Sequence, residues 1–63
     1  MDAEELKRAL QDADLGHLDD AASAFAVPPM QMLAWISGEK PIPHEVAERA
    51  LRLAALHAGG HQQ

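Results

Sequence analysis

The sequence predicts an all-α fold, a compact bundle of four to five short helices within one domain. Apolar residues recur every three or four positions along most of the chain, which is the spacing of amphipathic helices. Proline and glycine separate these periodic segments, and no segment shows the strict alternation of a strand. A chain of 63 residues forms only a thin core. We therefore expect a single domain at 1–58 and a flexible tail at 59–63.

The first predicted helix follows the N-terminus. Its apolar residues recur at spacings of three and four, which places them on one helix face: Ala3, Leu6, Leu10 and Ala13. Asp2, Glu4 and Glu5 lie in its first turn, where carboxylates suit the positive end of the helix dipole. We expect Gly16 to end this helix.

The second predicted helix is short and rich in small residues. Its sequence is LDDAASAFAV, and its buried face consists of Ala21, Ala22 and Phe25. Paired alanines allow another helix to approach closely. His17 or Asp19 caps its start, and Pro28 ends it because the residue before a proline is disfavoured in helical geometry.

The third predicted helix begins at Pro29, a residue that suits the first helical turn. Met32, Trp35 and Ile36 share one of its faces. We interpret Trp35 and Met32 as core residues rather than as ligand contacts. Ser37 and Gly38 end the helix.

The fourth predicted helix runs from Pro43 to the pair Gly59 and Gly60. Two acids each precede an arginine by four residues, which marks the solvent face: Glu45 with Arg49, and Glu48 with Arg52. The core face consists of Val46, Ala47, Ala50, Leu53 and Ala54. Leu51, Leu53 and Leu56 cannot all face one core, so Leu51 and Leu56 predict a symmetric homodimer surface. The alternative is that Leu51 covers the first helix of its own chain.

Composition excludes several classes of protein. The net charge of −5 disfavours nucleic-acid binding unless the few cations gather on one face. The chain has no cysteine, so a disulfide or thiolate metal site is excluded. No apolar run approaches a membrane span, and the acidic amphipathic N-terminus differs from a signal peptide. We expect a cytoplasmic protein without membrane attachment.

Candidate chemical sites are weak. Asp19 and Asp20 are adjacent, but no pocket or nucleophile accompanies them, so we expect no enzyme and no small-molecule substrate. His57 and His61 have the spacing of metal ligands on a helix, but the glycine pair between them should break that helix. We therefore expect no metal and no cofactor.

The spacing of the two central helices is more informative. The relevant residues are Ala21, Ala22, Phe25, Ala26, Val27, Met32, Trp35, Gly38 and the run Lys40-Pro41-Ile42-Pro43. Over about residues 17–54 this pattern resembles the helix-turn-helix domain of the Cro and phage-repressor (XRE-like) family. The resemblance implies that the third helix enters the major groove of DNA. It also implies that Val27 and Trp35 fill the wedge between the helices, that Gly38 turns the chain, and that Ile42 anchors the return in the core.

The resemblance implies a set of DNA contacts: Pro29, Met30, Gln31, Leu33, Ala34, Ser37 and Lys40. Gln31 can read an adenine edge, and otherwise it is plain solvated surface. The sequence departs from the family pattern in having Leu18 in place of a phosphate-contacting glutamine, Ala26 in place of the turn glycine, and Ile36 in place of an acid. No lysine or arginine occurs from Asp12 to Glu39.

The first hypothesis is a repressor-like transcriptional regulator that binds double-stranded DNA as a dimer. An alternative is a helix-turn-helix derivative that binds a regulatory protein through Met30, Leu33 and Ile36, with Ala34 and Ser37 beside them; methionines on an exposed helix face are typical of such surfaces. A third hypothesis is a DNA-mimic inhibitor whose carboxylates imitate phosphates: Asp12, Asp14, Asp19 and Asp20.

Overall fold

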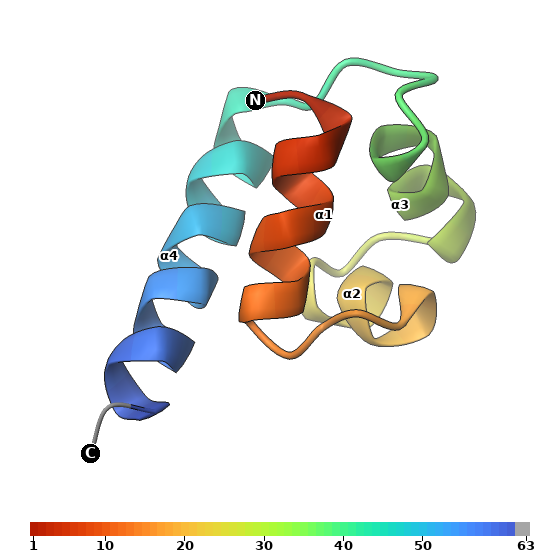
Figure 1. The fold of residues 1–63 in the computed structure, drawn as a ribbon. Coiled ribbons are helices and arrows are strands. Elements are labelled where there is room, and N and C mark those ends of the chain that lie inside the picture. Colours follow the sequence, from red (N-terminus) through yellow and green to blue (C-terminus); the bar gives the residue numbers. More distant parts are fainter. Residues whose placement is uncertain (62–63) are drawn as a thin grey trace.

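The computed structural model describes the backbone of residues 1–61 and the side chains of residues 1–57. This part of the chain contains four helices. They are α1 (Ala3–Asp12), α2 (Leu18–Ala24), α3 (Pro29–Ile36) and α4 (His44–His61). Helix α1 packs against α4 and against α3, and α2 packs against α3 (Figure 1). The predicted all-α fold is confirmed, with four helices in the described residues.

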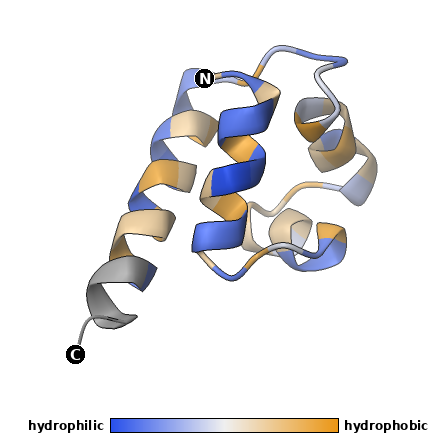
Figure 2. Cartoon of the chain, in the orientation of Figure 1, coloured by the Kyte–Doolittle hydropathy of each residue, from blue (hydrophilic) through white to orange (hydrophobic). Residues whose placement is uncertain are grey.

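The core is formed where α1 meets the other three helices. Leu6 and Met32 are fully buried, and Trp35 is 6% exposed. The other buried members of this cluster come from α1, from α2 and its C-cap residue, and from α4, and most are small: Ala9, Leu10, Ala21, Ala22, Phe25 and Ala50. The predicted core positions of Met32 and Trp35 are confirmed. Figure 2 shows that hydrophobic and hydrophilic residues alternate along α1 and α4, as expected for helices with one buried face.

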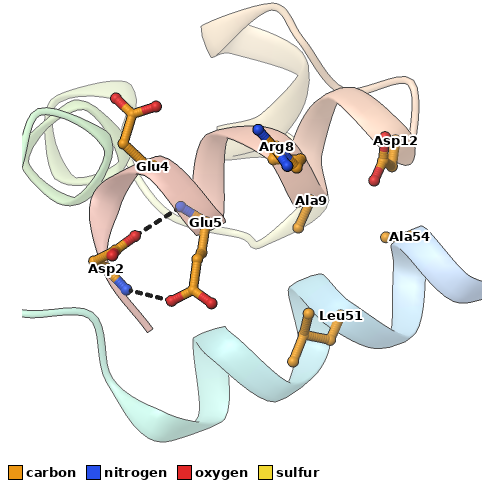
Figure 3. Close-up of a pocket in the computed structure, with 8 residues that line it drawn as sticks. All are labelled: Asp2, Glu4, Glu5, Arg8, Ala9, Asp12, Leu51 and Ala54. Carbon is orange, nitrogen blue, oxygen red and sulfur yellow. Dashed lines mark hydrogen bonds between the residues drawn. The ribbon is translucent and has the colours of Figure 1, made fainter.

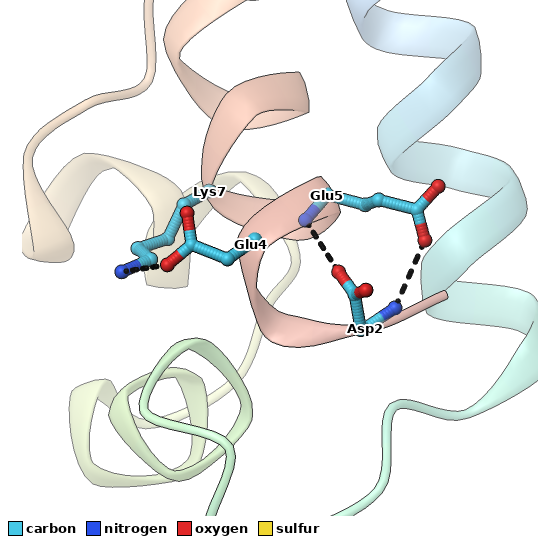
Figure 4. Close-up of polar contacts among 4 residues, drawn as sticks. All are labelled: Asp2, Glu4, Glu5 and Lys7. Carbon is cyan, nitrogen blue, oxygen red and sulfur yellow. Dashed lines mark hydrogen bonds and ion pairs between the residues drawn. The ribbon is translucent and has the colours of Figure 1, made fainter.

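A capping box starts α1. The Glu5 amide donates to Oδ1 of Asp2 (2.8 Å), and the Asp2 amide donates to Oε1 of Glu5 (3.1 Å; Figure 4). Two backbone donors that the helix leaves without partners are thereby satisfied. Lys7 Nζ lies 3.1 Å from Oε2 of Glu4 one turn further on. The acids of the first turn therefore fix the position at which α1 begins.

Helices α1, α2 and α3 each end in a left-handed residue: Asp14 (φ 62°), Ala26 (φ 56°) and Gly38 (φ 82°). After α2, the amide of Val27 donates to the carbonyl of Ala22 (3.0 Å), and that of Ala26 donates to Ser23 (3.1 Å). This pair of hydrogen bonds is the Schellman motif, which satisfies the last carbonyls of a helix.

Helix α1 ends in the same way, and this corrects one prediction. The amide of Leu15 donates to the carbonyl of Leu10 (2.7 Å), and that of Asp14 donates to Gln11 (3.0 Å). Gly16, which was expected to end α1, lies two residues beyond the left-handed position. Aspartate tolerates this conformation better than most side chains, so glycine is not required there.

The predicted turning and packing positions between α2 and α4 are found in the structure, whereas the predicted side-chain cap of α2 is not. Helix α2 begins after His17, whose side chain makes no capping hydrogen bond, and α3 begins with Pro29 in its first turn. Val27 and Ile42 are half-buried against the core. Gly38 turns the chain at the end of α3, so the predicted roles of these three residues as packing and turning positions are confirmed.

The solvent face of α4 differs from the prediction. The described residues contain neither the Glu45–Arg49 nor the Glu48–Arg52 ion pair; Glu48 Oε2 instead lies 3.1 Å from Nε2 of His44. The guanidinium of Arg49 lies over the ring of Phe25, 5.9 Å from its centroid, which is a cation–π arrangement. The spacing of residues along α4 carries no information about Phe25, the C-cap residue of α2, which Arg49 contacts in the fold.

The end of α4 also differs. The helix continues through the glycine pair to His61, beyond its expected end. Of the tail predicted at 59–63, residues 62–63 lie outside the described part of the chain. Within the described residues, no helix combines the length and the apolar character that crossing a lipid bilayer requires.

Candidate functional site

An exposed apolar stripe lies on α3. Met30 is 77% exposed, Leu33 is 45% exposed, and Ser37 at the end of the helix is also exposed. Their spacings of three and four place them on one face of the helix. Because Met32 and Trp35 occupy the core, this stripe is the surface that α3 presents to solvent.

Two of the predicted contact residues on α3 are not on this surface. Ala34 is 7% exposed, so the prediction that it faces the DNA groove is wrong. The chain after α3 returns along this side, since the amide of Lys40 donates to the carbonyl of Ala34 (3.1 Å). The hydroxyl of Ser37 donates to the same carbonyl (3.3 Å). The carbonyl of Ala34 thus accepts two hydrogen bonds from the residues that follow α3.

Ile36 is the second correction. It is half-buried, packs against the core, and lines a small hollow of about 90 Å³ together with Leu10, Leu15 and Leu18. It therefore contributes to packing between helices rather than to the partner surface predicted for it. Gln31 is half-buried, whereas Pro29 is exposed at the start of α3. The accessible predicted contacts on α3 are thus Pro29, Met30, Leu33 and Ser37, with Gln31 partly accessible.

Helix α3 carries no charged residue. The nearest cation along the chain is Lys40, which is exposed and lines a shallow hollow with Met1, Asp2 and Trp35 beside the start of α1. Glu39 precedes it and is exposed as well. The stripe on α3 is therefore an electrically neutral surface with one lysine at its C-terminal side.

The two leucines of the predicted dimer surface line different hollows. Leu51 is 57% exposed and faces α1, in a hollow that also includes Ala9 and Ala54. Leu56 is 66% exposed and lines a separate hollow that includes Leu15 and Ala24. Because they lie on different flanks of α4, Leu51 and Leu56 do not form one continuous patch. The alternative, in which Leu51 covers α1, describes its position better, although it leaves most of the side chain accessible.

The acids of the DNA-mimic hypothesis are all exposed: Asp12, Asp14, Asp19 and Asp20. They are distributed over the end of α1, the following turn and the first turn of α2. Among the described residues, no three histidines, aspartates or glutamates gather as metal ligands. The prediction that the glycine pair breaks the helix between His57 and His61 is wrong, since α4 continues through the pair. The side chain of His61 lies outside the described residues.

No family model matches this chain, and no curated protein or solved structure was found to be similar to it.

Two features of the structure were not predicted from the sequence, namely the left-handed conformation of Ala26 and the hollow between α1 and α4. For the first, the sequence offered one signal, the place of Ala26 at the turn glycine of the resembled family, but alanine itself is a strong helix former. The second was signalled only by the surplus of leucines on α4.

Proposed function

We propose that this chain is a small helix-turn-helix regulator that binds double-stranded DNA through α3. The observation that carries the proposal is the connection between α2 and α3. Ala26 adopts the left-handed conformation (φ 56°) at the position where the resembled family has glycine. This backbone conformation supports a helix-turn-helix turn in which alanine replaces the glycine. Since αL strain persists only where the surrounding structure imposes it, the turn geometry is a defined feature of this fold.

The α3 surface can enter a major groove in this arrangement. Met30 and Leu33 offer apolar contact to thymine methyl groups, and Gln31 offers an amide to an adenine edge. At the start of α3, Pro28 and Pro29 have no N–H and the amide of Gln31 donates to the carbonyl of Pro28 (3.0 Å), so the backbone offers a phosphate the amide of Met30. Lys40 supplies a charged phosphate contact. As a homodimer, two such helices would be spaced about one DNA turn apart, roughly 34 Å.

Charge makes a quantitative prediction for this binding. Each phosphate neutralised by a lysine or arginine contributes about −0.9 to the slope of log affinity against log salt concentration. One Lys40 per protomer therefore gives a dimer a slope of about −2, far shallower than the slope of a protein with six to ten phosphate contacts. The proposed regulator binds DNA weakly outside its target sequence and relies on base contacts.

The test is a titration of the ¹⁵N-labelled protein with random duplex DNA at low and at moderate salt. We expect amide shifts concentrated in α3 that shrink as salt rises. Met30→Asp should abolish them, whereas Leu56→Asp adds the same charge at a similarly exposed position on α4 (66% against 77%) and should leave the α3 response in place. Absence of any shift at low ionic strength refutes DNA binding.

A second candidate function is a protein-interaction module that uses the same stripe. The observation that favours it is the exposure of Met30 and Leu33 on a helix without charges, since flexible apolar side chains suit a protein partner. Affinity capture of a regulatory protein should then depend on Met30 and not on Leu56. If the Met30→Asp and wild-type proteins capture the same partners, the stripe is not the binding surface.

A further inference from the structure

A hollow of about 410 Å³ lies along α1 and α4, apart from the α3 surface. The apolar residues that line it are Ala9 from α1 with Leu51 and Ala54 from α4 (Figure 3). Leu51 is 57% exposed, although α1 and α4 pack against each other. The groove therefore contains a large apolar side chain that nothing in the described chain covers.

The rim of this groove is strongly acidic. The carboxylates of Asp2, Glu5 and Asp12 line it together with the one cation Arg8, whereas the fourth acid, Glu4, is paired with Lys7 (3.1 Å) and points away from α4 (Figure 3). The capping box holds the carboxylates of Asp2 and Glu5 in place near the start of α1, while Asp12 lies at its other end. Helix α1 has 10 residues, which corresponds to a length of about 15 Å. The acids are thus spaced along a groove that matches about three turns of another helix.

The negative charge at the rim limits which kinds of molecule can bind in this apolar groove. Nucleic acid, an anionic lipid surface or an anionic small molecule would be repelled by the rim. A wholly apolar partner would strip water from carboxylates without supplying compensating charge. A second copy of this chain carries a net charge of −5, so its body is repelled as well. A segment with one apolar face and flanking lysines or arginines satisfies both the apolar lining and the rim.

We propose that the α1–α4 groove binds a basic amphipathic helix of another protein, about ten residues long, with an apolar side chain packed on Leu51. Cations at its two ends pair with the acids near Asp2 and with Asp12. Leu51 supplies burial of apolar area, and the carboxylates supply orientation and a preference for cationic partners. The proposal does not depend on whether α3 binds DNA or protein.

The first experiment measures fluorescence anisotropy of a labelled helical peptide of about 14 residues, with leucines on one face and lysines on the other. We expect binding to the full chain at low salt, and no binding by the same peptide with glutamate in place of lysine. Leu51→Ala should weaken binding about five- to tenfold, because a half-exposed leucine loses its burial on the peptide. Leu56→Ala is the matched control and should leave affinity unchanged, since Leu56 lines a different hollow.

A second comparison separates the groove from bulk electrostatics. Asp12→Asn and Asp20→Asn change the net charge by the same amount, but only Asp12 lines the groove. We expect the first to weaken binding about threefold and the second to have no effect; this is the size of a partly exposed ion pair. Arg8→Gln should strengthen binding, because it removes the single like charge at the rim.

These measurements distinguish specific binding in the groove from nonspecific attraction. Equal losses for Asp12→Asn and Asp20→Asn, or for Leu51→Ala and Leu56→Ala, would show a nonspecific attraction and overturn the proposal. So would the absence of peptide binding at low salt, or amide shifts on titration that cluster in α3 rather than at Ala9 and Leu51. All four substitutions are at exposed positions, so circular dichroism should confirm an unchanged fold.

Discussion

Replacement of Ala26 by glycine should stabilise this protein. Ala26 is exposed and left-handed (φ 56°), and its amide and that of Val27 close the Schellman motif at the end of α2. An L-residue with a Cβ is strained in this conformation, whereas glycine adopts it readily. The backbone hydrogen bonds to Ser23 and Ala22 do not involve the side chain, so the substitution should preserve them.

The magnitude follows from two opposing terms. The left-handed conformation costs an alanine about 1–2 kcal/mol relative to the ordinary helical region. Glycine loses about 0.5–1 kcal/mol more conformational entropy on folding. The exposed methyl group contributes little burial, so the net gain is about 0.5–1 kcal/mol. For a domain of this size, that raises the melting temperature by about 2–8 °C.

Thermal unfolding followed by circular dichroism, together with urea denaturation, measures this gain. The control is Ala55→Gly, the same chemical change at an exposed position inside α4. There the glycine occupies ordinary helical geometry and should lower the free energy of unfolding by about 1 kcal/mol. If both variants lose stability equally, Ala26 is not held in a left-handed conformation, and the geometry that supports the proposed function fails with it.

Three further substitutions test the fold. Asp2→Ala should lower the free energy of unfolding by about 0.5–2 kcal/mol, while Asp2→Asn retains the cap and most of the stability; equal losses in urea denaturation would contradict the capping role. Trp35→Ala should cost about 3–5 kcal/mol and leave the domain largely unfolded at 37 °C, as seen in dispersion of its amide spectrum; a well-dispersed spectrum would place Trp35 outside the core. Arg49→Gln should cost about 0.5–1 kcal/mol through loss of the contact with Phe25. Arg52→Gln is its control in the same urea assay, expected to be neutral within about 0.5 kcal/mol, and a similar loss in both would argue against the cation–π contact.

Local sequence patterns predicted the elements well where one physical cause dominates. The apolar spacing of Leu6 and Leu10 and of Met32 and Trp35 predicted which faces are buried, because burial is the main favourable term in folding. Pro29 predicted the start of α3 because its ring fixes a helical φ. Gly38 predicted the turn after α3 for the corresponding reason on the left-handed side.

The sequence patterns failed where a long-range contact or an imposed backbone conformation decided the outcome. Ala34 has the periodicity of a surface position, but it is 7% exposed, and its carbonyl accepts a hydrogen bond from the amide of Lys40 in the segment after α3. Arg49 has a suitable acid, Glu45, four residues earlier on its own helix. Its guanidinium nevertheless lies over the ring of Phe25 at the end of α2. For the candidate sites, the sequence placed Met30 and Leu33 correctly on an exposed face, but it joined Leu51 and Leu56 into one surface that the packing of α4 divides between two hollows.

The sequence by itself determined the all-helical character, the four helical segments and most residues of the core, because these follow from periodicity and from the fixed backbone preferences of proline and glycine. Only the tertiary structure decided which side chains remain available to a partner. Exposure depends on what other helices and loops cover, and that is a property of positions distant along the chain. The same reason explains the left-handed Ala26 and the acidic groove around Leu51: each arises where separate segments meet.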